Sequence, residues 1–341
     1  MYYPLVKKLL SSLPERNREV LTRRYGFSGE PETLEAIGDD FDITRERVRQ
    51  LENAAFERLK TQGAAEDAES ALRTLLRHLQ DHGELRREDP FLDEVATAKE
   101  RPAVLLLLDL SELFGRHRES ADRHTVWATS PDAVSDVEAF NRSLVERLKE
   151  NFSEALLQKA FWKEVEAHAR SQSMRANEKA LRSWVDASKL FGEGPLGAWG
   201  VVDWPDISPK GAGDRAWLVL KKEGTPLHFE NLARLMNEKY FDDESLRPVH
   251  MQTVHNELIK DDRFVLVGRG LYGLTDWGYT AGTVKDVVAA VLRKAQKPMA
   301  KEDVLAQALT ERMVKPATVL LSLTDRKKFV RTPDGRYSLR A

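Results

Sequence analysis

Residues 33–60 read TLEAIGDDFDITRERVRQLENAAFERLK, and this stretch decides the fold of the N-terminal part of the chain. Thr33 belongs to the residue types that cap helices, so we predict a short helix beginning there and a turn over residues 40–43. Thr44 predicts the N-cap of a second helix, although position N3 holds Arg47 instead of the Glu or Gln of a complete capping box. The stretch therefore predicts a helix-turn-helix.

The second predicted helix has two distinct faces. Its apolar side chains recur at helical spacing and predict a buried stripe: Val48, Leu51, Ala55 and Leu59. Polar side chains fall off this stripe in the first turns: Arg45, Glu46, Arg49 and Gln50. A recognition helix presents its first turns to base edges, where the forked donors of Arg and Gln read guanine and adenine. We therefore predict a DNA-reading helix; a charged amphipathic helix without a DNA role is the alternative.

Three ordered blocks around this helix-turn-helix resemble region 4 of the sigma-70 family of transcription factors. The blocks are LPERNREVL followed by RRYG within residues 13–26, TLEAIG at residues 33–38 and TRERVRQLE at residues 44–52. The resemblance covers roughly the first 62 residues. It implies a module that reads the promoter −35 element and docks on the flap of the RNA polymerase β subunit.

The resemblance also implies which side chains contact DNA. The positions that match the base-contacting residues of the family are Arg45, Glu46, Arg49 and Gln50, and we add Arg47 to the candidate DNA-binding residues. No other stretch resembles the sigma segments that melt the −10 element. The chain is therefore not expected to start transcription by itself.

Length and composition limit the class of protein. A chain of 341 residues suggests two or more domains, and 41% hydrophobic and 32% charged residues are typical of a soluble, helix-rich protein. The absence of cysteine excludes disulfides, thiolate zinc sites and cysteine nucleophiles. The N-terminus lacks the apolar core of a signal peptide, and the longest apolar run, residues 104–108, is too short to span a bilayer. We therefore predict a cytoplasmic protein without a membrane partner.

The net charge of −2 conceals a gradient along the chain. Residues 1–62 carry no net charge, residues 279–341 carry +7, and the residues between them carry −9. This excludes a uniformly basic DNA-coating protein and makes the two ends the better candidates for phosphate contact. The candidates at the C-terminal end are Lys315, Arg326, Lys327, Lys328, Arg331 and Arg336. A solvated basic surface is the alternative interpretation.

A glycine-containing pattern repeats along the rest of the chain. The pattern G-x-aromatic-G-aliphatic-x-D-W occurs at residues 197–204 and 270–277, a shorter copy begins at Gly335, and a faint copy lies at residues 122–127. Each copy follows a segment that ends in phenylalanine: Phe114, Phe191, Phe264 and Phe329. Glycine in a tight turn before an alternating strand is typical of a β-hairpin, and helical patterns followed by a hairpin predict a winged helix.

We therefore predict a mainly α-helical fold with small β-hairpins, in which an N-terminal helix-turn-helix is followed by tandem winged-helix units. The predicted domains are residues 1–62 for the helix-turn-helix, residues 66–130 and 131–210 for two winged-helix-like units, residues 211–279 for a third, and residues 280–341 for a basic winged helix.

Some details of these units can be predicted as well. The first unit should contain helices near residues 68–82, 90–98 and 102–112. The third helix is so apolar that we expect it to be buried against protein and not to read DNA. Residues 205–213 predict a linker because they are rich in Pro and Gly. In the third unit we expect Val249, Val254, Leu258 and Ile259 on the inner face of a helix.

The third unit resembles the HARE-HTH winged helix. The matching features are GTPL at residues 224–227, DRF at residues 262–264 and GLYGLTDWG at residues 270–278. This domain is also found at the front of the RNA polymerase delta subunit and beside DNA-modification and restriction domains. The resemblance therefore implies a link to transcription or to DNA modification.

Two further patterns match binding-site motifs. Gly192, Gly194 and Gly197 match a dinucleotide-binding string, but they precede a predicted strand instead of a helix, so the hairpin is favoured. His78 and His82 have i,i+4 spacing, yet no third metal ligand is evident, which favours solvated helix residues.

His250 and His255 lie on a predicted recognition helix, where base or phosphate contact and a plain surface role remain open. No catalytic constellation stands out, so we predict no enzymatic activity, no cofactor and no metal site.

The leading hypothesis is a DNA-binding transcriptional regulator that reads promoter-type DNA through residues 45–50. Double-stranded DNA is the predicted partner, and RNA polymerase is a second candidate. An adaptor that binds RNA polymerase is the rival function, and a regulatory DNA-sensing component of a DNA-modification or defence system is a third. The sequence leaves the oligomeric state open.

Overall fold

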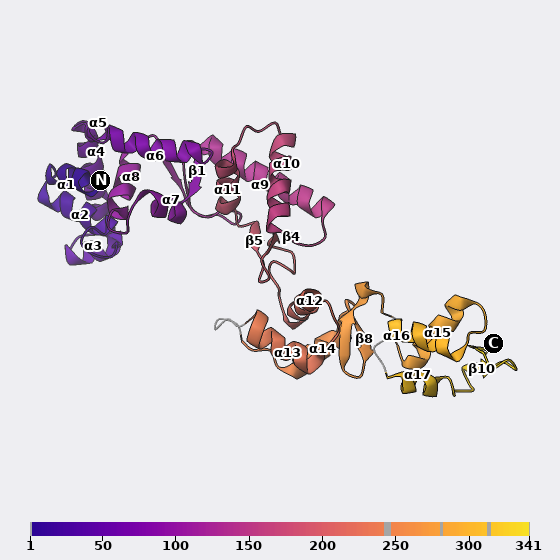
Figure 1. The fold of residues 1–341 in the computed structure, drawn as a ribbon. Helices are drawn as coiled ribbons and strands as arrows, with labels where there is room; N and C mark the ends of the chain where they lie inside the picture. Colours follow the sequence, from indigo (N-terminus) through magenta and orange to yellow (C-terminus); the bar gives the residue numbers. More distant parts are fainter. Residues whose placement is uncertain (1, 242–246, 280–281, 312–314, 341) are drawn as a thin grey trace. The chain divides into compact units, whose positions relative to one another are not determined.

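The computed structural model describes residues 2–241, 247–279, 282–311 and 315–340. Helices dominate, and the strands of the described residues form four small sheets (Figure 1). The chain divides into two compact units, Met1–Gly192 with Trp199–Val202 and Glu193–Ala198 with Asp203–Ala341. The predicted mainly α-helical fold with small β-hairpins is confirmed. Within the part of the chain that the structure describes, no helix combines the length and apolar character needed to cross a membrane.

The N-terminal part contains the predicted helix-turn-helix. Its helices are α1 (Tyr2–Ser11), α2 (Glu15–Tyr25), α3 (Leu34–Asp40), α4 (Arg45–Thr61) and the short α5 (Ala64–Asp67). Both predicted N-caps form, because the hydroxyl of Thr33 accepts from the amide of Ala36 at 3.1 Å and that of Thr44 accepts from the amide of Arg47 at 3.2 Å. These caps fix where α3 and α4 begin.

A small apolar core holds the three helices α2, α3 and α4 together. Val20, Ile37 and Val48, one from each helix, are fully buried. The turn between α3 and α4 is tight: the amide of Ile43 donates to the carbonyl of Gly38 at 2.9 Å. A Cβ atom on Gly38 would lie 2.7 Å from the carbonyl oxygen of Ile43, so only glycine fits there without displacement.

The first segment after α5 contains the three predicted helices. Its elements are α6 (Glu69–Asp81), β1 (Leu85–Arg87), α7 (Glu88–Val95), α8 (Arg101–Leu110), β2 (Gly115–His117) and β3 (Val126–Ala128). Strand β3 lies between β1 and β2 and is antiparallel to both. Helix α8 packs on α1, α2 and α4 in a shared hydrophobic core. The prediction that this apolar helix is buried against protein is confirmed.

The second segment contains α9 (Pro131–Asn151), β4 (Leu156–Leu157), α10 (Gln158–Ser171), α11 (Glu178–Ala187), β5 (Phe191–Glu193) and β6 (Ala198–Val201). Its sheet has the strand order β4-β6-β5. Helix α11 packs against β1 of the preceding segment, where the indole Nε1 of Trp184 donates to the carbonyl of Gly83 at 3.0 Å. The first two segments are therefore joined by buried contacts.

The linker predicted at residues 205–213 is wrong for its first half. Asp206 and Ile207 are buried, and so is Trp204 just before them. A Cβ atom on Gly194 would lie 2.1 Å from the carbonyl oxygen of Asp206, which shows how closely this stretch packs. Its Pro and Gly residues shape a packed turn, and the next helix already begins at Ala212.

The third segment contains α12 (Ala212–Glu223), β7 (Leu227–His228), α13 (Phe229–Leu235), the π-helical turn η1 (Met236–Tyr240), α14 (Met251–Lys260), β8 (Phe264–Gly268), β9 (Leu271–Leu274) and the 3₁₀ turn η2 (Thr275–Trp277). The strand order is β7-β9-β8, antiparallel. The core contains Val254 and Leu258, as predicted. The prediction that Ile259 also faces the core is wrong, because this residue is 64% exposed.

The fourth segment contains α15 (Val284–Ala295), α16 (Lys301–Glu311), α17 (Pro316–Ser322), β10 (Phe329–Arg331) and β11 (Tyr337–Leu339). The two strands form an antiparallel hairpin. Residues 280 and 281, at the predicted start of the last unit, lie outside the described residues.

The glycine repeat marks equivalent hairpin positions. Gly197, Gly270 and Gly335 all have left-handed backbones, with φ of 79°, 69° and 85°, just before the second strand of their hairpins. Gly200 lies in β6 and Gly273 in β9, as the repeat predicts. The match to a dinucleotide-binding string at residues 192–197 therefore belongs to the β5–β6 hairpin, as predicted.

Candidate nucleic-acid interface

Helix α4 presents the predicted polar residues to solvent. Its side chains in the first turns are all exposed: Arg45, Glu46, Arg47, Arg49 and Gln50. The neighbouring Val48 is fully buried and fixes the rotation of the helix. The cap at Thr44 and the core contact of Val48 therefore display one polar face at the start of α4.

Two side-chain pairs organise this face. The guanidinium of Arg49 donates to both carboxylate oxygens of Glu46, at 2.8 and 2.6 Å. These hydrogen bonds hold the pKa of the Glu46 carboxyl below its usual value. The Nη1 atom of Arg47 donates to the amide oxygen of Gln50 at 3.0 Å. Four of the five candidates are thus partly oriented before any ligand arrives.

Arginines in the preceding blocks brace the helix-turn-helix. Arg23 donates to Glu32 at 2.8 and 2.5 Å and to Asp40 at 2.5 Å, and its guanidinium lies 5.5 Å from the ring centroid of Phe41. Arg24 donates to Glu52 of α4 at 3.1 Å. Arg24 contacts α4 directly, and Arg23 holds the residues that precede α4. Sequence spacing does not predict these contacts, because the partners are distant along the chain.

A second anchor fixes α4 against α2. The side-chain amide of Asn17 donates to the backbone carbonyl of Leu51 at 2.9 Å. The neighbouring Arg16 reaches the residue that follows α3, where its guanidinium lies 5.3 Å from the ring centroid of Phe41. The polar face of α4 is therefore carried on a scaffold held by both apolar and polar contacts.

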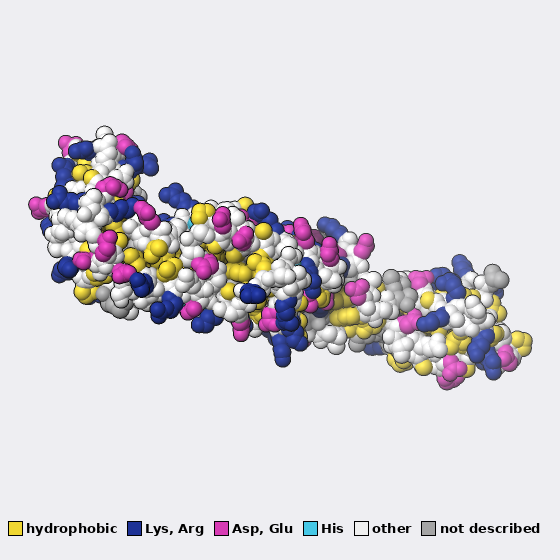
Figure 2. Space-filling model, turned by 90° about the horizontal axis from the view of Figure 1, so that it is seen from above, with side chains coloured by type: hydrophobic (Ala, Val, Ile, Leu, Met, Phe, Trp, Pro, Cys, Tyr) yellow, Lys and Arg dark blue, Asp and Glu magenta, His cyan; other side chains and the backbone are white. Residues whose placement is uncertain are grey.

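The predicted basic residues of the fourth segment are also exposed. They lie at the N-cap of α17, in the loop from α17 to β10 and along the hairpin: Lys315, Arg326, Lys327, Lys328, Arg331 and Arg336. Two of them have acidic partners, since Lys328 lies 2.8 Å from Asp286 and Arg336 lies 3.4 Å from Asp334. Figure 2 shows Lys and Arg interspersed with Asp and Glu on the face in view.

His250, the N-cap residue before α14, and His255 within α14 both make local contacts. The Nδ1 atom of His250 accepts from the amide of Gln252 at 3.2 Å and caps the helix. The ring of His255 packs against Phe229, with centroids 4.5 Å apart. Base or phosphate contact by either histidine stays a prediction.

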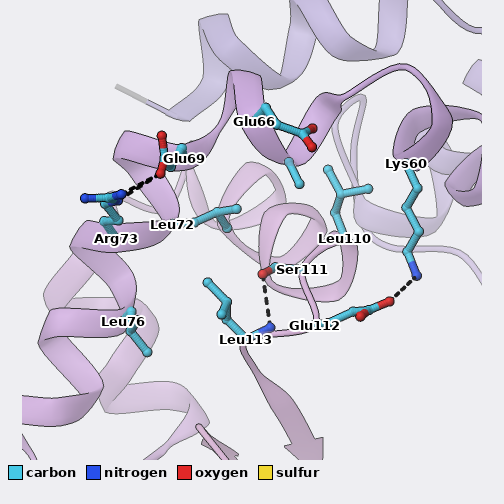
Figure 3. A pocket seen from close by; sticks show the side chains of 11 residues that line it. Lys60, Glu66, Glu69, Leu72, Arg73, Leu76, Leu110, Ser111, Glu112 and Leu113 are labelled. Carbon is cyan, nitrogen blue, oxygen red and sulfur yellow. Dashed lines mark hydrogen bonds and ion pairs between the residues drawn. The ribbon is translucent and has the colours of Figure 1, made fainter.

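A pocket of about 550 Å³ lies at the opposite end of α4 from the polar face (Figure 3). Its apolar lining comes from α6, α8 and the residues that follow α8: Leu72, Leu76, Leu110 and Leu113. Ion pairs lie at its rim, where Lys60 is 3.5 Å from Glu112 and Arg73 is 2.6 Å from Glu69. The lining carries three carboxylates, Glu66, Glu69 and Glu112, against two cations, so the pocket is poorly suited to a phosphate.

The interpretation of His78 and His82 as solvated helix residues is wrong. Their side chains are 23% and 13% exposed, and their rings stack with centroids 4.4 Å apart. Glu94 of α7 supplies a third group, which spacing along the chain does not predict. The missing signal is tertiary, because Glu94 reaches the pair only after α7 packs on α6.

Comparison with known proteins identifies the N-terminal part. The family described as sigma-70, region 4 matches residues 9–61. The RNA polymerase sigma factor SigA of Nostoc sp. is 48% identical over 56 residues, which are 16% of this chain and 14% of that protein. SigA1 of Synechococcus elongatus is 49% identical over 53 residues, 15% of this chain and 13% of the relative. The chain therefore contains a sigma-70 region 4 domain at residues 9–61.

Proposed function

We propose that the chain is a DNA-binding transcriptional regulator that reads promoter-type double-stranded DNA with α4. The observation that carries this proposal is the exposed, oriented polar face at the start of α4, inside a domain shared with RNA polymerase sigma factors. A helix set this way can enter a major groove with its first turns against base edges. The chain spans only 14% of the length of SigA of Nostoc sp. and 13% of that of SigA1 of Synechococcus elongatus.

Within this proposal the residues have separate roles. Arg45, Arg49 and Gln50 supply donors to base edges, each worth about 1–3 kcal/mol when the contact is bidentate. Glu46 orients Arg49 in the free protein and discriminates between bases by accepting from cytosine or repelling other acceptors. Arg47 adds positive charge beside the phosphates.

We propose that the four segments after α5 are winged helices, the third of the HARE-HTH type. Each combines three longer helices with a small sheet or hairpin, and three share the glycine turn. The first segment packs against the region 4 domain through α8. The exposed cations of the fourth make it the best candidate for additional phosphate contact.

An RNA polymerase-binding adaptor is the second candidate function. The observation in its favour is charge: residues 63–278 carry −9, and Lys328 and Arg336 of the fourth segment already pair with carboxylates. Such a chain would repel DNA over most of its length. In this function the region 4 domain contacts polymerase and the later segments contact other proteins.

Selection of binding sites from a randomised duplex pool tests the DNA proposal. Full-length protein should enrich a consensus, and Arg49→Ala should change at least one position of it. Arg73→Ala is the matched control, because Arg73 is an exposed helical arginine that also pairs with a glutamate, at 2.6 Å. An unchanged consensus for Arg49→Ala would remove α4 from base reading. Recovery of polymerase subunits from the host after nuclease treatment would then support the adaptor.

A further inference from the structure

Three side chains with metal-binding chemistry meet at the corner between α6 and α7. His78 and His82 lie one turn apart on α6, and Glu94 lies on α7. The Oε2 atom of Glu94 is 2.9 Å from Nε2 of His78 and 3.8 Å from Nε2 of His82. All three potential ligand atoms lie within 4.8 Å of one another. Ligands of a tetrahedral Zn²⁺ ion at about 2.0–2.1 Å from the metal are about 3.4 Å apart, so small rotations would suffice.

The backbone fixes which nitrogen His82 can offer. Its Nδ1 atom lies 2.7 Å from the carbonyl oxygen of His78 and must carry the proton to donate there. The lone pair then resides on Nε2, the atom that lies near Glu94. A hydrogen bond from the second ring nitrogen to a carbonyl is the usual support of a metal-bound imidazole.

A second group of residues supports the other two ligands. Arg86 donates to Oε1 of Glu94, which leaves Oε2 directed at the histidines, and it also lies 3.5 Å from Asp186. The ring of Phe91 packs against His78, with centroids 5.5 Å apart.

We propose that His78, His82 and Glu94 bind a divalent transition-metal ion, Zn²⁺ by the chemistry of the ligands. Two imidazoles and one carboxylate match Zn²⁺, and the set contains no thiolate that would favour a softer ion. Glu94 is 37% exposed, so water can occupy the fourth position. The ion would join α6 to α7 at a corner separate from the polar face of α4, where it stabilises the first segment.

Metal binding by the full-length chain tests the site directly. After removal of bound metal with a chelator, Zn²⁺ is titrated in competition with a chromophoric chelator. Wild type should bind one equivalent, and His82→Gln and Glu94→Gln should each weaken binding at least about tenfold, since even the loss of a supporting group commonly costs 10–100-fold. His228→Gln is the matched control. His228 also lies beside a glutamate, 3.6 Å from Glu230, but it is not part of the cluster of His78, His82 and Glu94.

X-ray absorption at the zinc edge of the loaded wild-type protein decides the question even when a variant folds poorly. The expected spectrum shows two imidazole nitrogens and further light ligands at about 2.0–2.1 Å. Zn²⁺ should also raise the melting temperature of wild type and of His228→Gln, but not that of His82→Gln. Failure to bind one equivalent, or equal affinity in wild type and His82→Gln, would overturn the proposal and leave an ordinary His–Glu hydrogen-bond cluster.

Discussion

At the scale of single residues, Gly38 is a position on which the geometry of the helix-turn-helix depends directly, because it has no side chain. Its Cβ position is 2.7 Å from the carbonyl oxygen of Ile43, inside the turn that orients α4. Asp42 in the same turn has a left-handed backbone with φ of 52°. The turn therefore has little freedom to move away from a larger residue.

We predict that Gly38→Ala destabilises the helix-turn-helix by about 1–3 kcal/mol, the usual cost of overpacking a tight site. Amide hydrogen exchange over residues 34–51 should become faster by a corresponding factor. Gly29→Ala is the matched control, because a Cβ atom there would meet nothing within 4 Å. Equal protection in the two variants would show that the turn relaxes freely.

The exposed residues of α4 were predictable from the sequence, but their pairing was only partly so. The periodicity of Val48, Leu51, Ala55 and Leu59 places residues 45–50 off the buried stripe. The i,i+3 spacing allows Arg49 to reach Glu46, yet the bidentate contact depends on side-chain conformations that spacing does not specify. Contacts between helices, such as that of Arg24 with Glu52, require the folded chain.

At the scale of elements, helix α15 shows how one cap joins a helix to a distant loop. The hydroxyl of Thr283 accepts from the amide of Asp286, and the carboxylate of Asp286 accepts from the amide of Thr283, which completes a capping box. Lys328, which precedes β10, donates to the same carboxylate at 2.8 Å. Lys328 and the hydroxyl of Thr283 hold the pKa of Asp286 well below its usual value.

This depressed pKa predicts an acid-dependent loss of stability in the fourth segment. A carboxyl group with a lower pKa in the folded chain stabilises the fold above its unfolded pKa, about 3.9 for aspartate, and loses this effect as the pH falls through the folded pKa. Asp286→Asn should therefore accelerate amide exchange in α15 at neutral pH, and the difference from wild type should shrink below about pH 4. A constant difference across that range would contradict the role of Asp286.

The elements themselves were predicted best where local chemistry defines them. Gly197, Gly270 and Gly335 mark turns because a left-handed backbone is a local requirement. Ile259 was misplaced because it follows Leu258 directly, and neighbouring helical residues point about 100° apart. The packed stretch around Ile207 was misread because burial there depends on distant partners, while its Pro and Gly composition is the same as in an open linker.

At the scale of the whole molecule, the parts of the chain differ in how they pack and in their net charge. Helix α8 joins the region 4 domain to the first segment, and the hydroxyl of Tyr25 donates to Asp109 at 2.6 Å across the same contact. The sequence predicted that α8 is buried but not which helices cover it, because an apolar stripe does not specify its partner. The net positive charge of the chain lies in residues 279–341, which carry +7, whereas residues 63–278 carry −9.

The charge of the C-terminal end predicts how DNA affinity depends on salt. Each phosphate contact releases counterions, so log affinity falls with log salt by a slope of about 0.9 per contact on duplex DNA. Arg326 and Lys327 are exposed in the loop before β10, whereas Lys328 is engaged with Asp286. If the fourth segment touches DNA, neutralising the first two residues should flatten the slope by up to about 1.8 and leave the preferred sequence unchanged.

The measurement compares wild type, Arg326→Gln/Lys327→Gln and the control Arg73→Gln/Arg77→Gln by titration over a range of salt. The control removes the same charge from exposed positions on α6, in the acidic part of the chain. A flatter slope only in the C-terminal variant places phosphate contacts on the fourth segment, because an effect of net charge alone would appear equally in both variants. Identical slopes in all three proteins would show that these cations do not touch DNA, and the polymerase-binding adaptor would then become the better explanation of the chain.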